Sequence, residues 1–341
     1  MFLESQSKNL RAAMFHPTIL DVIGNTPLVK LNKINPYPHV TILAKVEFLN
    51  PGSSIKDRIV KYIIDDAEKK GLLKPGGTIV ENTSGNTGAA AAMIGAIRGF
   101  RVILTMPDKV SKEKQNALKA YGAEIIVCPT SASPDSPEHY VNRAKQLAQD
   151  IPNSFRINQY DNLKNPEAHY LTTGPEIWEQ AQGKVDYFVA SASTGGTITG
   201  VGRYLKEHNP EVKVIMPDPI GSIYYDYFKT GHIPPGGNCN YLLEGIGEDH
   251  IAHALDFSVV DDVVPVTDAN AFQVTRQLAT MEGLLAGGSS GANVWAALNL
   301  AKFLTKPATI VTVLPDGGVK YLSKIFDNEW MENHHLLERT L

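Results

Sequence analysis

The sequence predicts an α/β protein in which mostly parallel sheets are covered on both faces by helices. Short apolar runs, several of them rich in valine and isoleucine, alternate with longer amphipathic runs through most of the 341 residues. That alternation is typical of parallel strands joined by crossover helices. Glycine-rich segments stand at several junctions between an apolar run and the amphipathic run that follows it. The length favours two domains or one large α/β unit.

The expected strands and helices follow one another as strand-to-helix units. In chain order, the strands are expected at residues 41–48, 78–81, 101–106, 124–128, 186–191, 212–216 and 309–314. The helices are expected at residues 55–70, 87–98, 112–121, 139–149, 197–208, 269–281 and 292–303. Several of these helices follow a Ser, Thr, Asp or Gly residue, which favours a helix start.

These units divide into two domains, each with its own helix-covered sheet. We expect a smaller domain at residues 50–164 and a larger one at 165–330, to which the early segment 25–49 also belongs. Residues 1–24 and 331–341 are expected to be terminal extensions.

The composition excludes several classes of protein. Hydrophobic residues make up 43% of the chain and charged residues 20%, which is typical of a compact globular protein. The net charge is −4 without any long run of Lys and Arg, so neither nucleic acid nor a membrane is expected as a partner. The chain shows no secretory signal and no apolar stretch long enough to span a bilayer, which predicts a cytoplasmic location. Cys128 and Cys239 lie far apart, so we expect neither a disulfide framework nor a metal site.

Lys56 is the candidate for covalent chemistry. It lies in the run 50–58, Asn-Pro-Gly-Ser-Ser-Ile-Lys-Asp-Arg, ahead of a second run, 83–88, Thr-Ser-Gly-Asn-Thr-Gly, at a helix start. A lysine amine reacts with carbonyl groups when a site holds it beside an aldehyde such as that of pyridoxal phosphate. Taken alone, however, Lys56 is equally well explained as a solvated surface charge beside Asp57 and Arg58.

Three glycine-rich loops are candidates for binding the rest of such a cofactor and its substrate. Loop 193–197, Ser-Thr-Gly-Gly-Thr, opens a helix whose free N–H groups favour a phosphate. Loop 83–88 offers N–H groups and hydroxyls for a carboxylate, and Ser289 in loop 287–291 offers a hydroxyl for a ring nitrogen. Each loop on its own is also explained by a tight turn or by helix capping. Their joint occurrence with Lys56 favours the functional interpretation.

Lys56 and these loops, in this order, resemble the fold-type II pyridoxal phosphate enzymes (tryptophan synthase β-like), specifically the cysteine synthase and cystathionine β-synthase family. The resemblance runs from about Ile23 to Trp330. It implies pyridoxal 5'-phosphate as the cofactor, with Lys56 as the Schiff-base residue and as the base that removes the substrate α-proton. It also implies that the smaller domain is mobile and binds the substrate, whereas the larger one binds the cofactor phosphate.

The resemblance carries further roles onto matching residues. Asn86 is expected at the cofactor ring hydroxyl and Ser289 at the pyridine nitrogen. The residues implied to bind the cofactor are Lys56, Asn86, Ser193, Thr194, Gly195, Gly196, Thr197 and Ser289. The residues implied to bind the substrate are Thr83, Ser84, Gly85, Thr87, Gln159, Tyr160 and Gly245.

Within the family, the chain is most similar to the cystathionine β-synthase catalytic core. The similarity rests on the pair Gln159-Tyr160 and on the segments 218–222, 244–247 and 314–316. It implies condensation of L-serine, or an activated serine, with L-homocysteine to form cystathionine, in a homodimer. The alternative activity is that of a cysteine synthase, which uses O-acetylserine and sulfide. A serine or threonine dehydratase and a non-catalytic cofactor-binding or partner-binding protein are further alternatives.

Two residues depart from the family pattern. Ser193 stands where the family usually has glycine, so its hydroxyl either alters the fit of the cofactor phosphate or donates to it. Glu248 stands where cystathionine β-synthases have an aromatic residue. Its carboxylate is interpreted either as attracting an amino group of the second substrate or as a solvated surface charge. The chain lacks the patterns expected for haem binding and has no room for C-terminal regulatory modules, so neither haem nor adenosylmethionine control is expected.

Overall fold

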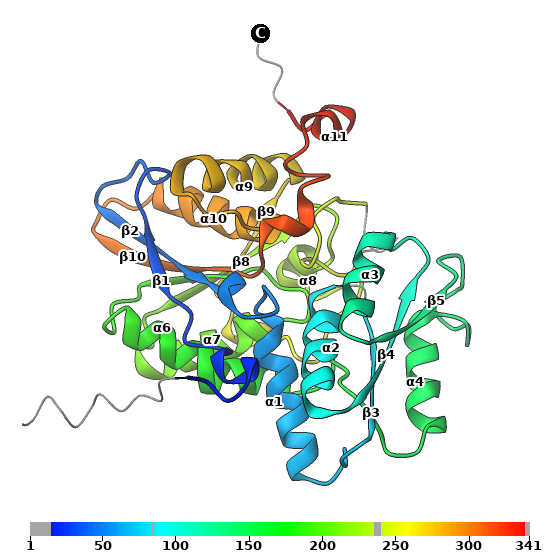
Figure 1. Ribbon diagram of the computed structural model, residues 1–341. Coiled ribbons are helices and arrows are strands. Elements are labelled where there is room, and N and C mark those ends of the chain that lie inside the picture. The colour runs from blue at the N-terminus through cyan, green and yellow to red at the C-terminus, as the bar shows by residue number, and fades with distance from the viewer. Residues whose placement is uncertain (1–14, 84, 235–239, 338–341) are drawn as a thin grey trace, which may run out of the picture.

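The computed structural model describes residues 15–83, 85–234 and 240–337, which form two β-sheets covered by helices (Figure 1). One sheet has six strands in the order β1-β2-β10-β7-β8-β9, and the other has four in the order β5-β4-β3-β6. All neighbouring strands run parallel except β1, which is antiparallel to β2. The predicted α/β class with mostly parallel sheets is therefore confirmed.

The larger sheet combines strands from both ends of the chain. Its strands are β1 (Leu28–Leu31), β2 (Val40–Val46), β7 (Tyr187–Val189), β8 (Lys213–Pro219), β9 (Asp262–Val266) and β10 (Ala308–Leu314). The last of these returns to the middle of the sheet and pairs with both β2 and β7. The smaller sheet is made of β3 (Thr78–Asn82), β4 (Arg101–Pro107), β5 (Glu124–Cys128) and β6 (Ser154–Arg156).

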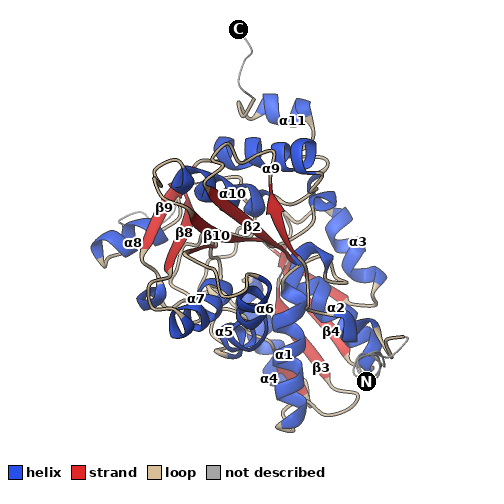
Figure 2. Ribbon diagram, turned by 90° about the vertical axis from the view of Figure 1, so that its left-hand side faces the viewer, coloured by secondary structure: helices blue, strands red, loops and turns tan. Residues whose placement is uncertain are grey.

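Helices cover both faces of each sheet, as Figures 1 and 2 show. On the larger sheet, α9 (Asp268–Glu282) and α10 (Gly288–Ala301) lie on one side, and α6 (Gly174–Gln180) and α7 (Gly196–His208) lie on the other. On the smaller sheet, α2 (Asn86–Arg98) and α3 (Lys112–Ala120) lie opposite α4 (Tyr140–Asp150). The remaining helices are α1 (Lys56–Lys69), α5 (Lys164–Ala168), α8 (Tyr224–Thr230) and α11 (Asn328–Asn333).

All seven predicted strands and all seven predicted helices are present, with ends shifted by a few residues. One of these shifts corrects a predicted strand end. The strand expected at 41–48 ends at Val46, and the chain continues in the 3₁₀ turn Glu47–Leu49. Three strands, β1, β6 and β9, and four helices, α5, α6, α8 and α11, were not predicted. The limits of the two domains stay a prediction. No helix within the described residues is long and apolar enough to cross a membrane.

Helix α1 connects the two sheet units. Its buried face, which includes Ile59 and Ile63, belongs to the same apolar cluster as Ile79 of β3 and Ile94 of α2. Its first turn instead contacts the larger sheet, because the backbone N–H of Ile55 donates to the Pro315 carbonyl just after β10, at 2.9 Å. The start of α1 therefore lies where the two units meet.

Candidate active site

Two adjoining cavities lie at the carboxyl ends of strands from both sheets, the usual location of ligand sites in parallel α/β folds. The larger has a volume of about 480 Å³, and the smaller has about 40 Å³. Lys56, Ser193 and Gly245 line both. The larger is also lined by the predicted residues Thr83, Gly85, Asn86, Thr87, Gln159, Tyr160 and Ser289. The smaller is also lined by Thr194, Gly195, Gly196 and Thr197. Ser84 lies outside the described residues.

Lys56 is the first residue of α1 and faces the junction of the two cavities. Burial lowers the pKa of its amine, and the negative charges of Asp316 and Glu248 only partly oppose this effect. A lysine with a lowered pKa has a larger fraction of neutral amine, the form that attacks an aldehyde. The position and electrostatics of Lys56 therefore fit a Schiff-base residue, and the solvated-surface interpretation is wrong.

Three helices begin at these cavities with a glycine as N-cap: Gly85 for α2, Gly195 for α7 and Gly287 for α10. Glycine has no side chain to cap the free N–H groups of the first turn. Those groups and the positive end of the helix dipole remain available for an anion. One expectation needs correction here. Ser289 lies inside the first turn of α10 and not in a loop before it, so it is not the N-cap residue.

The start of α7 is shaped for close approach of a ligand to the backbone. Gly195 has φ +79°, in the left-handed region that favours glycine. A Cβ atom at Gly195 would overlap Leu255, and one at Gly196 would overlap the side-chain amide of Asn165. Both glycines are therefore required for this backbone path, and the bare N–H groups beside the small cavity fit a phosphate.

The sequence did not identify Asn165 and His169, which support this loop from α5 and from the π-helical turn His169–Thr173. Asn165 donates to Thr194 Oγ1 at 2.9 Å, and His169 Nε2 lies 3.2 Å from Thr197 Oγ1. Burial keeps the pKa of His169 well below its ordinary value, so the ring is neutral. Both residues lie in the unassigned stretch 150–185 between two predicted elements, where no motif marked them.

Asn86 is held by two polar residues from the far end of the chain. Its Nδ2 donates to Asp316 Oδ2 at 2.9 Å, and its Oδ1 accepts from Lys320 Nζ at 2.5 Å. Burial raises the pKa of Asp316, whose Oδ1 has no hydrogen-bond partner among the described residues. Asp316 and Lys320 line the larger cavity as well, so the predicted set was incomplete at this end of the site.

Gln159 is positioned by its own backbone and by the first turn of α2. Thr87 Oγ1 donates to Gln159 Oε1 at 2.7 Å. The backbone N–H groups of Asn158 and Gln159 donate to the carboxylate of Glu81, at 2.8 and 3.3 Å. Burial raises the pKa of Glu81 to about 7. The amide of Gln159 therefore lies next to the expected substrate-carboxylate loop.

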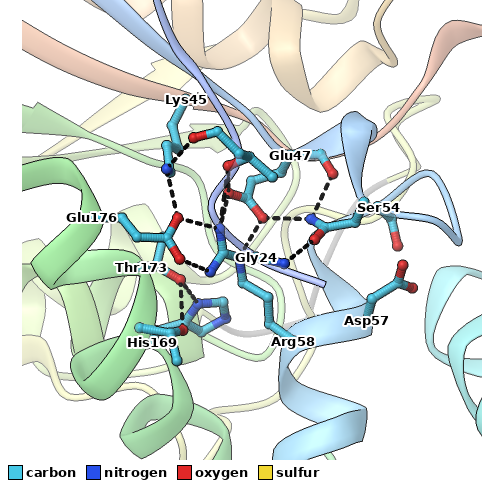
Figure 3. Close-up of polar contacts among 12 residues, drawn as sticks. Gly24, Lys45, Glu47, Ser54, Asp57, Arg58, His169, Thr173 and Glu176 are labelled. Atoms are coloured by element: carbon cyan, nitrogen blue, oxygen red, sulfur yellow. Dashed lines mark hydrogen bonds and ion pairs between the residues drawn. The ribbon is translucent and has the colours of Figure 1, made fainter. Parts of the chain in front are cut away.

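A buried network of charges fixes the first turn of α1 (Figure 3). Arg58 donates to both carboxylate oxygens of Glu47, at 2.7 and 2.9 Å, and to both oxygens of Glu176, at 2.7 Å each. Lys45 donates to Glu176 Oε2 at 2.6 Å. Arg58 follows Lys56 by two residues, so these pairs hold the Lys56 backbone against α6 and against the 3₁₀ turn that follows β2.

The structure brings Tyr160 together with Ser193 and Glu248, the two residues that depart from the family pattern. Tyr160 and Ser193 both donate to Glu248 Oε1, at 2.7 and 2.6 Å. Only 15% of the Glu248 side chain is exposed, so its interpretation as a solvated surface charge is wrong. The Ser193 hydroxyl donates to Glu248 in this structure, and its role beside the cofactor phosphate stays a prediction.

Two helix-covered, mostly parallel sheets with a lysine between uncapped helix starts define the class of fold-type II pyridoxal phosphate enzymes. The pattern of the family described as "Pyridoxal-phosphate dependent enzyme" matches residues 19–316, and the chain belongs to that family. The predicted cofactor, pyridoxal 5'-phosphate, and the predicted enzyme class are thereby confirmed.

The individual relatives of this chain are named after three different enzyme activities. The cystathionine β-synthase of Apis mellifera is 47% identical over 340 residues, which cover 98% of this chain and 66% of that protein. Cysteine synthase 1 of Neurospora crassa is 41% identical over 318 residues, which cover 92% of this chain and 84% of that protein. A solved O-ureido-L-serine synthase matches with a TM-score of 0.84 and 38% identity, covering 92% of this chain and 96% of that one. The chain thus spans just under two thirds of the length of the Apis protein.

Proposed function

We propose that this chain catalyses pyridoxal-phosphate-dependent β-replacement, condensing L-serine or an activated serine with L-homocysteine to give cystathionine. The observation that carries the proposal is the position of Lys56 at the junction of two cavities, with uncapped helix starts facing both. Relatives named cystathionine β-synthase and cysteine synthase support this class of reaction. When bound, the cofactor supplies an electron sink for the substrate α-carbon.

The smaller cavity is the proposed phosphate site. The N–H groups at the start of α7 and the hydroxyls of Thr194 and Thr197 hold the phosphate. In the larger cavity, Asn86 donates to the ring hydroxyl of the cofactor, and the Ser289 hydroxyl forms a hydrogen bond with its pyridine nitrogen. A neutral hydroxyl at that nitrogen leaves the ring less protonated than a carboxylate does, which suits β-elimination.

Lys56 has two proposed tasks, both performed by its Nζ atom. Its neutral amine holds the cofactor aldehyde, and after release it takes the proton from the substrate α-carbon. Both tasks need an amine that is unprotonated near neutral pH, and burial lowers the pKa of Lys56 in that direction. The network around Arg58 fixes the backbone from which the amine reaches the cavities.

The substrate carboxylate is proposed to bind at the start of α2. Its donors are the Thr83 hydroxyl, the backbone N–H groups near Gly85 and Thr87, and the amide of Gln159, which the Thr87 hydroxyl orients. With the carboxylate held there, the α-carbon lies in the cavity that Lys56 lines. The smaller domain is proposed to close over the substrate and to exclude water. Closure limits hydrolysis of the reacting substrate before the thiol adds.

The test is a matrix of donors and nucleophiles. The purified protein is supplied with serine, O-acetylserine or O-phosphoserine as donor, together with homocysteine or sulfide, and the amino-acid products are identified by mass. Cystathionine is the expected product. Formation of cysteine from sulfide, with no cystathionine from any donor, would contradict the proposal and favour a cysteine synthase, the second candidate that the Neurospora relative supports. Release of ammonia and a keto acid without a thiol would indicate a dehydratase.

A further inference from the structure

Glu248 is a carboxylate in the reaction cavity with one oxygen in use and one available. Its Oε1 accepts hydrogen bonds from Tyr160 and from Ser193. Its Oε2 accepts no hydrogen bond from any described residue, and its nearest cationic group, His250 Nδ1, is 3.7 Å away. That His250 nitrogen lies 2.9 Å from Asp249 Oδ1 instead. Glu248 therefore retains an acceptor for a ligand.

The surroundings hold Glu248 in place, and apart from His250 they supply no opposite charge to it. Tyr160 and Ser193 contribute neutral hydroxyls, and Ser222 Oγ fixes the Glu248 backbone by accepting from its N–H at 3.1 Å. No Lys or Arg of the described chain lies within ion-pair distance of Glu248. By contrast, Glu244 in the same cavity pairs with Lys114 and Lys324. A cationic group is thus the complementary ligand for Glu248.

Glu248 also lies close to the reacting centre. It lines the larger cavity together with Lys56, and its charge acts on the Lys56 amine. A ligand cation held by Glu248 is therefore within the same cavity as the substrate carbon that receives the nucleophile. The cavity volume of about 480 Å³ accommodates a small amino thiol beside the bound substrate.

From this arrangement we infer that Glu248 is a specificity-determining residue that binds the protonated amine of the incoming nucleophile. The inference rests on the proposed β-replacement function and names its second substrate as a class, thiols that carry an ammonium group. Tyr160 and Ser193 are positioning residues, because they orient the Glu248 carboxylate through Oε1 and leave Oε2 as the acceptor for a ligand. A charge-assisted hydrogen bond of this kind changes binding by roughly tenfold or more.

The experiment compares two thiols of equal length, 2-(dimethylamino)ethanethiol and 2-mercaptoethanol. A tertiary amine cannot form an imine with the cofactor aldehyde, so its ammonium reports on Glu248 alone. We expect the wild-type holoenzyme to prefer the amino thiol. In Glu248→Gln the ratio of the two kcat/KM values falls by about tenfold, mainly through the KM of the amino thiol. Activity with sulfide, which has no amine, is measured alongside, because any effect of the lost charge on the Lys56 amine is shared by all nucleophiles and cancels in the ratio.

The matched control is Asp249→Asn, which removes the same charge from the neighbouring residue, whose side chain is 65% exposed. It leaves the ratio unchanged. A readout independent of turnover is the dissociation constant of 2-(dimethylamino)ethanol, measured by ligand-observed NMR on the holoenzymes. That constant rises about tenfold in Glu248→Gln but not in Asp249→Asn. If Glu248→Gln does not retain cofactor, Glu248→Tyr, which restores an aromatic residue, provides the same comparison.

Three results overturn the inference in distinguishable ways. An unchanged ratio in Glu248→Gln, with normal turnover of both thiols, refutes amine recognition and leaves β-replacement intact. An equal loss of kcat with every thiol and with sulfide assigns Glu248 to proton transfer instead. Absence of product from every nucleophile with the wild-type protein refutes the proposed function itself, and the inference with it.

Discussion

The guanidinium of Arg58 forms a bidentate ion pair with Glu176, with both nitrogen-to-oxygen distances at 2.7 Å. Only 1% of the Arg58 side chain and 14% of the Glu176 side chain are exposed. The pair joins the first turn of α1 to α6 beneath the larger sheet. Because Lys56 is in that same turn, the ion pair sets the position from which its amine enters the cavities.

Glu176→Gln should destabilise the protein strongly, because it leaves the buried charge of Lys45 without its carboxylate and Arg58 with Glu47 alone. We expect a loss of about 3–5 kcal/mol in the free energy of unfolding, measured by urea denaturation. The control is Glu124→Gln, since Glu124 also forms a bidentate pair, with Arg101, but is 53% exposed. It should cost less than about 1 kcal/mol. Similar losses for the two variants would show that burial of the pair is unimportant.

The same residue predicts a pH dependence. Although burial opposes it, the hydrogen bonds and charges of Arg58 and Lys45 lower the pKa of Glu176 to about 2. A carboxyl with a lowered folded-state pKa stabilises the native state fully above its unfolded pKa. That stability, about 3 kcal/mol here, is lost as the pH falls through the folded value. Between pH 4.5 and 2, wild-type stability should therefore fall more steeply than that of Glu176→Gln. Parallel curves would contradict this assignment.

Gly196→Ala should weaken cofactor binding, because the added methyl group overlaps the amide of Asn165 and displaces the start of α7. We expect the dissociation constant for pyridoxal phosphate, followed by absorbance, to rise by at least about tenfold. The control is Gly202→Ala in the same helix, where the nearest atom to the added Cβ is Val214 Cγ2 at 3.3 Å. If Gly196→Ala bound pyridoxal phosphate with wild-type affinity, the phosphate would have to bind away from the start of α7.

Ser193→Gly should leave cofactor affinity almost unchanged. The Ser193 hydroxyl donates to Glu248, and the phosphate is assigned to the N–H groups of α7. Removing the hydroxyl therefore breaks the contact with Glu248 but leaves the proposed phosphate donors in place. The dissociation constant for pyridoxal phosphate should stay within about twofold of the wild-type value. A tenfold weakening would instead show that Ser193 donates to the phosphate directly.

The fold could be predicted from its long, strongly patterned elements, whereas the missed elements lacked a clear period. Strand β9 lies at an edge of the sheet and contains Pro265, a residue that normally argues against a strand. Helix α6 begins with Gly174 and Pro175, which as a pair indicate a turn. Strand β6 has only three residues. In these segments, packing against neighbouring elements determined the structure more than local propensity did.

The candidate site was predictable where its residues form loops of distinctive composition, such as 83–88 and 193–197. Asn165 and His169 were missed because they act through Thr194 and Thr197, and a supporting side chain leaves no pattern in a single sequence. The meeting of Tyr160, Ser193 and Glu248 was equally hidden, since three distant segments supply it. Their proximity depends on how the two sheet units pack.

The most direct test of this account is to locate the cofactor's attachment point. The holoenzyme is reduced with borohydride, digested, and searched by mass spectrometry for the lysine that carries the pyridoxyl phosphate group. The account predicts labelling of Lys56, and loss of both the label and the near-visible absorbance band in Lys56→Ala. Labelling of another lysine, such as Lys320 in the same cavity, or a colourless wild-type protein with no label, would contradict it.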